Sequence, residues 1–115
     1  MRATFGGVGE GICEALLEPD DAVVVAGLEF DSRNVEHLSR HGLDQNIVWD
    51  VLADAPIFVL DSKEHAATHL MTGRESTGRM WTVVIMLVDD ELDWWRPITG
   101  WPSERLEVET WREGN

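Results

Sequence analysis

A chain of 115 residues has room for one hydrophobic core, and its 43% hydrophobic and 27% charged residues are typical of a globular domain. The formal net charge of −13 argues against a surface devoted to nucleic acid, which would concentrate positive charge. The single cysteine, Cys13, excludes an internal disulfide, and no apolar run reaches the roughly 20 residues of a membrane span. We therefore expect a cytoplasmic protein with no membrane partner.

Residues 1–27 differ from the rest of the chain because glycines crowd their start, namely Gly6, Gly7, Gly9 and Gly11. Their spacing does not match a dinucleotide-binding loop, so we interpret the segment as a leader that is either flexible or adds a strand. Within it, residues 12–18 are expected to form two helical turns, and the apolar residues 22–26, which include three β-branched valines, a buried strand. The folded domain is then predicted over residues 28–115.

Two short helices are predicted after the first strand of this domain. Asp31 or Ser32 is a suitable N-cap for the first helix, and Gly42 is the type of residue that follows many helix ends. Asp44 has the same capping chemistry and is expected to begin the second helix. The predicted ranges are 28–31 for the strand, and 33–41 and 45–52 for the helices.

Four further strands and a final helix follow. Apolar or alternating stretches separated by polar turns predict strands over residues 57–60, 66–73, 79–88 and 93–99, and a helix over residues 104–111. Because short turns join successive strands, the predicted fold class is α+β, with a compact antiparallel sheet of about four to five strands and the helices on one face. The most apolar strand should lie at the sheet centre, and Pro97 should interrupt pairing in the last strand.

One stretch, FDSRNVEHLSRHGL, carries a recognisable spacing through Phe30, Asp31, Asn34, His37, Leu38, Arg40, His41 and Gly42. Further along, a Gly-Arg pair occurs on each side of the predicted hairpin turn, and the last strand contains Arg96, Pro97, Ile98 and Thr99. In this order the motifs resemble the BrnT family of type II toxin–antitoxin toxins, within the RelE-like ribonuclease group. The resemblance covers residues 28–111. Gly100 and Trp101 stand where that family usually has alanine and arginine.

The resemblance implies a RelE/BrnT-like fold, metal-independent cleavage of messenger RNA without a cofactor, and neutralisation by a partner antitoxin. It implies catalytic roles for His37, His41 and Arg79. It also implies RNA or phosphate contacts for Arg40, Arg74 and Arg96. The arginines on neighbouring strands would form a positive patch if their side chains faced the same way. Pairing of each arginine with a nearby carboxylate is the alternative.

The histidines allow a second, weaker interpretation. His37 and His41 are four residues apart and share a helical face, which is a spacing that can hold zinc. No third ligand completes a definite motif, and His65 and His69 lie in a predicted turn and strand, where their side chains would not converge simply. We therefore expect no metal site.

Six tryptophans in so short a chain suggest a protein interface. Trp94 and Trp95 are adjacent on a predicted strand and must face opposite sides, whereas Trp49 and Trp81 are expected in the core. An interface formed by Trp94, Trp95 and Trp101 would serve a homodimer or a hetero-oligomer with an antitoxin. A non-catalytic acidic binding or dimerising protein is thus the alternative to the ribonuclease, and a small-molecule pocket between sheet and helices is a third hypothesis.

Overall fold

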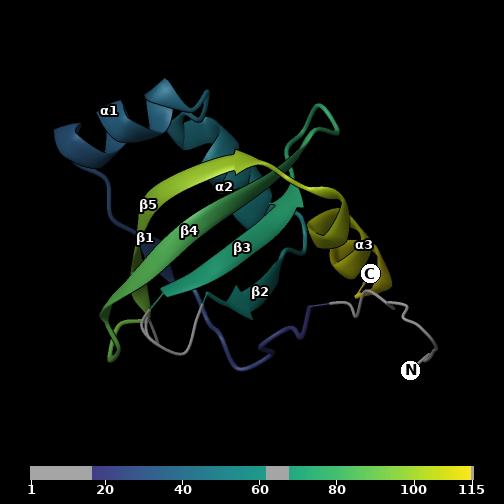
Figure 1. Cartoon of the computed structure of the whole chain (residues 1–115). Coiled ribbons are helices and arrows are strands. Elements are labelled where there is room, and N and C mark those ends of the chain that lie inside the picture. The colour runs from purple at the N-terminus through teal and green to yellow at the C-terminus, as the bar shows by residue number, and fades with distance from the viewer. Residues whose placement is uncertain (1–16, 62–67, 115) are drawn as a thin grey trace.

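The computed structural model describes residues 17–61 and 68–114, which form an α+β domain (Figure 1). The structure confirms the predicted order of two helices, then four strands, then a final helix. Most of the helix expected over residues 12–18 lies outside the described residues. The elements are β1 (Gly27–Leu28), α1 (Ser32–Arg40), α2 (Gln45–Ala53), β2 (Ile57–Leu60), β3 (Thr68–Arg74), β4 (Met80–Asp89), β5 (Trp94–Pro102) and α3 (Arg105–Glu113).

The sheet is mixed, and the prediction of a purely antiparallel sheet is wrong at one edge. The strand order is β1-β5-β4-β3-β2, and β1 pairs in parallel with β5 while the other neighbours are antiparallel. The α1–α2 pair leads the chain to β2 at the far edge of the sheet, and the antiparallel strands β3, β4 and β5 then return it to the side of β1. Alternating hydrophobicity predicts a strand but does not encode the direction of its partner. β4 lies at the centre of the sheet, as expected.

The helices lie on both faces of the sheet, so the prediction of one covered face is also wrong. Trp81 and Val83 of β4 join a core that contains Val48 and Val51 of α2. The intervening residue, Thr82, points to the opposite face and donates a hydrogen bond to Glu107 of α3 at 2.9 Å. α1 and α2 therefore cover one face, whereas α3 packs at one end of the other (Figure 1).

The first helix begins and ends where its capping chemistry predicts. The Asp31 carboxylate accepts hydrogen bonds from the backbone N–H groups of Arg33 and Asn34, and the Asn34 side chain accepts from the N–H of Asp31, which completes a capping box. Gly42 follows with a φ of 85°, a left-handed conformation that favours glycine. Asp44 caps α2 in the predicted way by accepting from the N–H of Ile47.

The segment before β1 runs along the sheet without forming the strand predicted over residues 22–26. Its first described part is joined to β2, where Asp20 N–H donates to the Phe58 carbonyl at 2.6 Å and Pro19 bridges to Val59. The Val24 carbonyl is used by the Trp95 indole N–H rather than by a neighbouring strand. Regular pairing with β5 is limited to the two residues of β1, which is also shorter than predicted.

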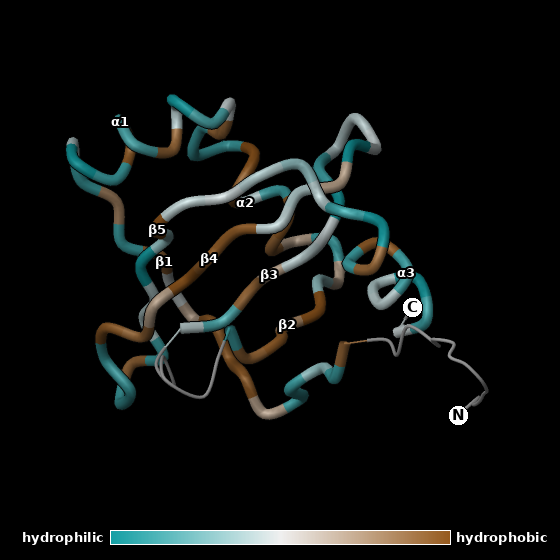
Figure 2. Tube along the Cα trace, viewed as in Figure 1, coloured by the Kyte–Doolittle hydropathy of each residue, from teal (hydrophilic) through white to brown (hydrophobic). Residues whose placement is uncertain are grey.

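The main core lies between the sheet and the α1–α2 pair. Figure 2 shows the hydrophobic residues concentrated in the strands and the hydrophilic ones along α1. Trp81 is buried as expected, but Trp49 is 43% exposed on α2, so its predicted place in the core is wrong. Its neighbour Val48 takes the inward position instead, because successive residues of a helix face different directions. In the part of the chain that the structure describes, no helix is both long and apolar enough to cross a membrane.

Candidate functional site

The junction between α1 and β5 is organised by one buried side chain, Asn34. Its amide nitrogen donates to the carbonyls of Glu29 and Pro97, each at 3.0 Å, and its oxygen accepts from the Asp31 N–H at 2.8 Å. β1 ends before it reaches Pro97, so α1 covers the β5 edge that has no strand beside it. Asn34 is thus a positioning residue: its hydrogen bonds hold α1 against the sheet.

Arg96 projects from β5 into this junction and is held by two carboxylates. Its guanidinium donates to Glu29 at 3.0 Å and to Asp31 at 2.9 Å, and its side chain is only 18% exposed. The hydrogen bond from Arg96, aided by that from the Asn34 N–H, lowers the pKa of Asp31 from 3.8 to about 2. The same pair with Asp31 raises the pKa of Arg96, so the guanidinium is firmly charged but locally neutralised.

A depression of about 270 Å³ opens beside Arg96 and is lined by Arg33, Asn34, His37, Arg96 and Ile98. His41 continues the same face of α1, with its ring centroid 5.0 Å from that of His37. Among residues 17–61 and 68–114, no carboxylate lies within 4 Å of the Arg33 guanidinium. The depression is therefore lined by one unpaired cation, one paired cation and one imidazole, with the His41 ring beside that of His37, which suits an anionic group the size of a phosphate.

The other predicted strand arginines do not join this site. Arg74 and Arg96 pair in register with Met80 and Met86, which are six residues apart on β4, so their backbones are separated by about 20 Å at roughly 3.3 Å per residue. Arg79 precedes β4 at the same end as Arg74. The condition for one positive patch is therefore not met, because Arg96 lies at the opposite end of the strands from Arg74 and Arg79.

Each of the remaining predicted cations has its own partner. Arg74 donates to Asp54 at 2.8 Å and lies over the Trp111 ring, and Arg79 lies 4.5 Å from the centroid of the Trp81 ring. Arg40 is paired with Glu36 on the exposed side of α1. The alternative of pairing with a carboxylate therefore holds for Arg40 and Arg74, whereas Arg79 contacts an aromatic ring and has no carboxylate within 4 Å among the described residues.

Only one of the three predicted interface tryptophans presents an exposed ring. Trp94 is 42% exposed, whereas Trp95 is buried against the core, as expected for neighbours on a strand. Trp101 is half-buried, and its indole N–H donates to the Glu107 carboxylate at 3.1 Å. The interface hypothesis therefore rests on Trp94 and on whatever apolar residues lie beside it.

A buried polar cluster on the α3 face was not predicted. Glu107 accepts hydrogen bonds from the Thr82 hydroxyl, the Trp101 indole and the Glu104 N–H, and the Thr82 hydroxyl also contacts those of Thr72 and Ser103 at 2.8 and 2.9 Å. The sequence signal was a glutamate at the third position of a helix, which forms a capping box. The cluster anchors α3 to the sheet. Each of its polar side chains is hydrogen-bonded to another member of the cluster and so is not available to a ligand.

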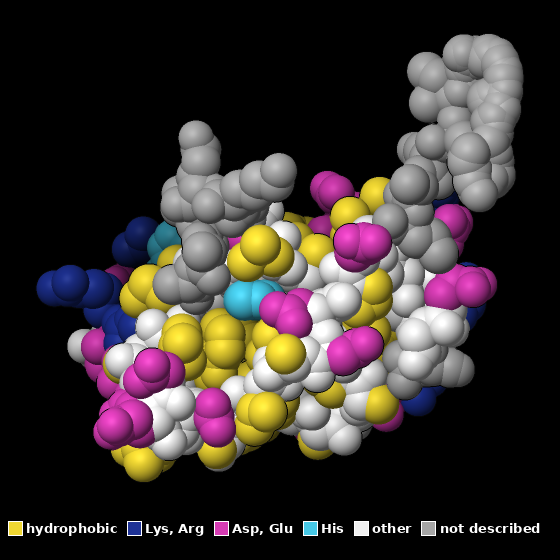
Figure 3. Space-filling model, turned by 90° about the horizontal axis from the view of Figure 1, so that it is seen from below, with side chains coloured by type: hydrophobic (Ala, Val, Ile, Leu, Met, Phe, Trp, Pro, Cys, Tyr) yellow, Lys and Arg dark blue, Asp and Glu magenta, His cyan; other side chains and the backbone are white. Residues whose placement is uncertain are grey.

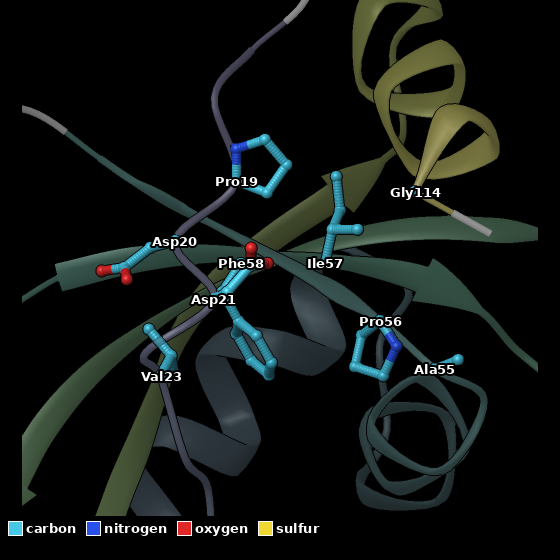
Figure 4. Close-up of a pocket in the computed structure, with 9 residues that line it drawn as sticks. All are labelled: Pro19, Asp20, Asp21, Val23, Ala55, Pro56, Ile57, Phe58 and Gly114. Carbon is cyan, nitrogen blue, oxygen red and sulfur yellow. The ribbon is translucent and has the colours of Figure 1, made fainter.

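A second depression, of about 310 Å³, lies between the segment before β1, the start of β2 and the C-terminal end of α3 (Figure 4). Asp20 is at its rim, but its carboxylate is directed away from Pro56 and Ile57 and contacts His69 at 3.0 Å. The walls are mostly apolar side chains and backbone. This depression offers no converging set of side chains for chemistry.

Within the described residues, no group of three or more His, Cys, Asp or Glu side chains could hold a metal ion. Cys13 and His65 lie outside the described residues. Comparison with known proteins returned no matching family model, no matching curated protein and no matching solved structure.

Proposed function

We propose that the protein is a BrnT-like member of the RelE-like toxin group and that the α1–β5 depression receives a phosphate of RNA. The observation that supports this most is the meeting of Asn34, His37 and Arg96 around one depression. These residues belong to two separate stretches of the BrnT-like motif pattern. The β-α-α-β-β-β-β-α order of elements agrees with the same proposal.

The chemistry would be an internal transfer at the phosphate. His37 takes the proton from a ribose 2′-hydroxyl, and the 2′-oxygen attacks phosphorus as the bond to the 5′-oxygen breaks. The departing 5′-oxygen takes a proton from His41, which leaves a 2′,3′-cyclic phosphate and a 5′-hydroxyl. Arg33 and Arg96 stabilise the charge that builds on the phosphoryl oxygens. The nucleophile belongs to the substrate, so this reaction does not require a metal ion.

The charge of the chain would make RNA binding weak. A net charge of −13 repels a polyanion at long range, and Glu29 and Asp31 already neutralise Arg96. Arg33 then supplies most of the local attraction. A partner antitoxin would complement the acidic surface better than RNA does.

Phosphate binding can be tested with a fluorescent RNA oligonucleotide whose 2′-hydroxyls are methylated, so that it binds but cannot react. We expect Arg33→Ala to weaken binding about tenfold in low salt, because a hydrogen bond to a charged group is worth about 1.5–3 kcal/mol. Arg112→Ala is the matched control, since Arg112 is also exposed and has no carboxylate within 4 Å in the described part of the chain. Equal affinities of the two variants would argue against this site.

A non-catalytic acidic binding protein is the second candidate function. It is favoured by the pairing of Arg96 with two carboxylates and by the exposed ring of Trp94. Induction of the protein in a bacterium separates the two candidates. Arrested growth with cleaved messenger RNA supports the toxin, whereas normal growth with intact messenger RNA, despite folded protein, supports the binding protein.

A further inference from the structure

Exposed hydrophobic side chains gather at one end of the sheet, around the β4–β5 hairpin. Val88, Leu92 and Trp94 are 46%, 58% and 42% exposed, and all three lie within seven residues of one another. Val24, which is 56% exposed, lies on the adjoining segment, where Ala26 N–H donates to the Asp93 carbonyl. These four residues, which we call the hairpin surface, are most of the large hydrophobic side chains that the described chain exposes.

Hydrogen bonds and one close packing contact hold the hairpin surface in place. Asp89 accepts hydrogen bonds from the backbone N–H groups of Glu91 and Leu92, which holds the turn. The Trp94 ring lies directly on Gly27, where an added Cβ would be only 2.9 Å from the indole. The ring therefore has one face on the backbone and leaves the other available. A partner would meet this surface already formed, without the cost of ordering it.

Carboxylates surround the apolar side chains. Asp89, Asp90, Glu91 and Asp93 belong to the same hairpin, and in residues 17–61 and 68–114 no lysine or arginine lies within 4 Å of any of them. Figure 3 shows acidic and hydrophobic side chains together at the lower left of the molecule, toward the end where the hairpin lies in Figure 1, with Lys and Arg side chains higher on the same side. A ligand for this surface must be apolar at its centre and positively charged at its rim.

We propose that the hairpin surface binds a cationic amphipathic segment of a partner protein. The apolar side of such a segment would cover Leu92 and Trp94, and its lysines or arginines would pair with the surrounding carboxylates. A second copy of this chain fits poorly, because it would place four carboxylates against four others. The proposal is independent of the ribonuclease activity, since none of these residues lines the α1–β5 depression.

The test uses the full chain and a fluorescent 14-residue leucine–lysine peptide that forms an amphipathic helix, with a leucine–glutamate peptide as its charge-reversed control. We expect Leu92→Asn to weaken binding of the lysine peptide about tenfold, because truncation of a central apolar contact has the largest effect. Leu60→Asn is the matched control, since Leu60 is also an exposed leucine, with 40% of its surface accessible, but lies on β2. The double variant Asp90→Asn with Glu91→Gln should weaken binding about threefold and reduce its salt dependence.

Three results would overturn the proposal. One is equal loss of binding in Leu92→Asn and Leu60→Asn, which would mean that the peptide binds at another site or binds non-specifically. Another is binding of the glutamate peptide as tight as that of the lysine peptide, or no binding of either. The third is a dimer in size-exclusion chromatography that Leu92→Asn dissociates, which would make a second copy the occupant.

Discussion

Arg96 donates a hydrogen bond to Asp31 at 2.9 Å and so joins the last strand to the N-cap of the first helix, 65 residues earlier in the chain. The same carboxylate also accepts from the first N–H groups of α1. One acidic side chain therefore serves both as a helix cap and as the counter-ion of the arginine beside the candidate site. The position of His37 and Arg33 relative to β5 depends on this shared contact.

The stability of the fold should fall in acid partly through Asp31. Its pKa in the folded protein is about 2, below the usual 3.8, so the folded state favours the ionised form. This contribution is fully present above about pH 4 and is lost as the pH falls from 3.8 towards 2. We expect the difference in unfolding midpoint between wild type and Asp31→Asn to be constant at neutral pH and to shrink over that interval.

The control for this pH dependence is the same substitution in an Arg96→Met background. Arg96 is the main cause of the lowered pKa of Asp31, so most of the pH-dependent difference should disappear with it. Urea titrations at a series of pH values measure the unfolding midpoints of both pairs of proteins: wild type with Asp31→Asn, and Arg96→Met with the double variant. A difference that stays unchanged without Arg96 would show that the helix N–H groups alone hold the carboxylate.

Glu107 should contribute strongly to stability although it lies on an acidic helix. Glu107→Ala removes the acceptor for Thr82, Trp101 and the Glu104 N–H, which leaves buried donors unsatisfied. We expect a loss of about 2–3 kcal/mol in the free energy of unfolding, measured by chemical denaturation. Glu109→Ala, which removes only an exposed ion pair with Arg105, should change it by less than about 1 kcal/mol. Equal effects of the two substitutions would show that the buried cluster is not an anchor.

Gly100 stands where the BrnT-like pattern usually has alanine, and packing gives a reason. A Cβ at this position would lie 2.5 Å from the Leu43 side chain and 2.8 Å from the Thr82 carbonyl oxygen. We expect Gly100→Ala to destabilise the protein by about 1–3 kcal/mol, because a backbone oxygen cannot move aside cheaply. A Gly100→Ala variant as stable as wild type in thermal unfolding would mean that Leu43, in the connection between α1 and α2, and the β4 backbone at Thr82 move away from β5 more readily than their packing suggests.

Local structure was largely predictable from the sequence, whereas the arrangement of the sheet was not. Asp31, Gly42 and Asp44 determine where α1 and α2 begin or end through contacts within a few residues. The parallel pairing of β1 with β5 and the placing of α3 on the second face depend on contacts between distant residues. Residues 22–26, three of them valine, illustrate the limit: despite their strand propensity they form no regular strand, and this segment meets the sheet only through isolated hydrogen bonds.

The candidate site was predicted in part. His37 and Arg96 were identified from the motif pattern and do line one depression, together with Arg33, which the pattern did not single out. Arg74 was grouped with them because it also lies on a strand. The strand register shows that Arg74 and Arg96 are far apart, because their partners on β4, Met80 and Met86, are separated by six residues. Residue spacing along one strand says nothing about position along its neighbour.

The proposed ribonuclease activity is tested most directly by incubating the purified protein, in the presence of a metal chelator, with an end-labelled RNA. A copy of the same sequence with 2′-deoxyriboses throughout serves as the control substrate. We predict fragments that end in 2′,3′-cyclic phosphate from the RNA only, and a rate at least about 100-fold lower for His37→Ala. Intact RNA with correctly folded protein, or cleavage that His37→Ala leaves unchanged, would contradict the proposal.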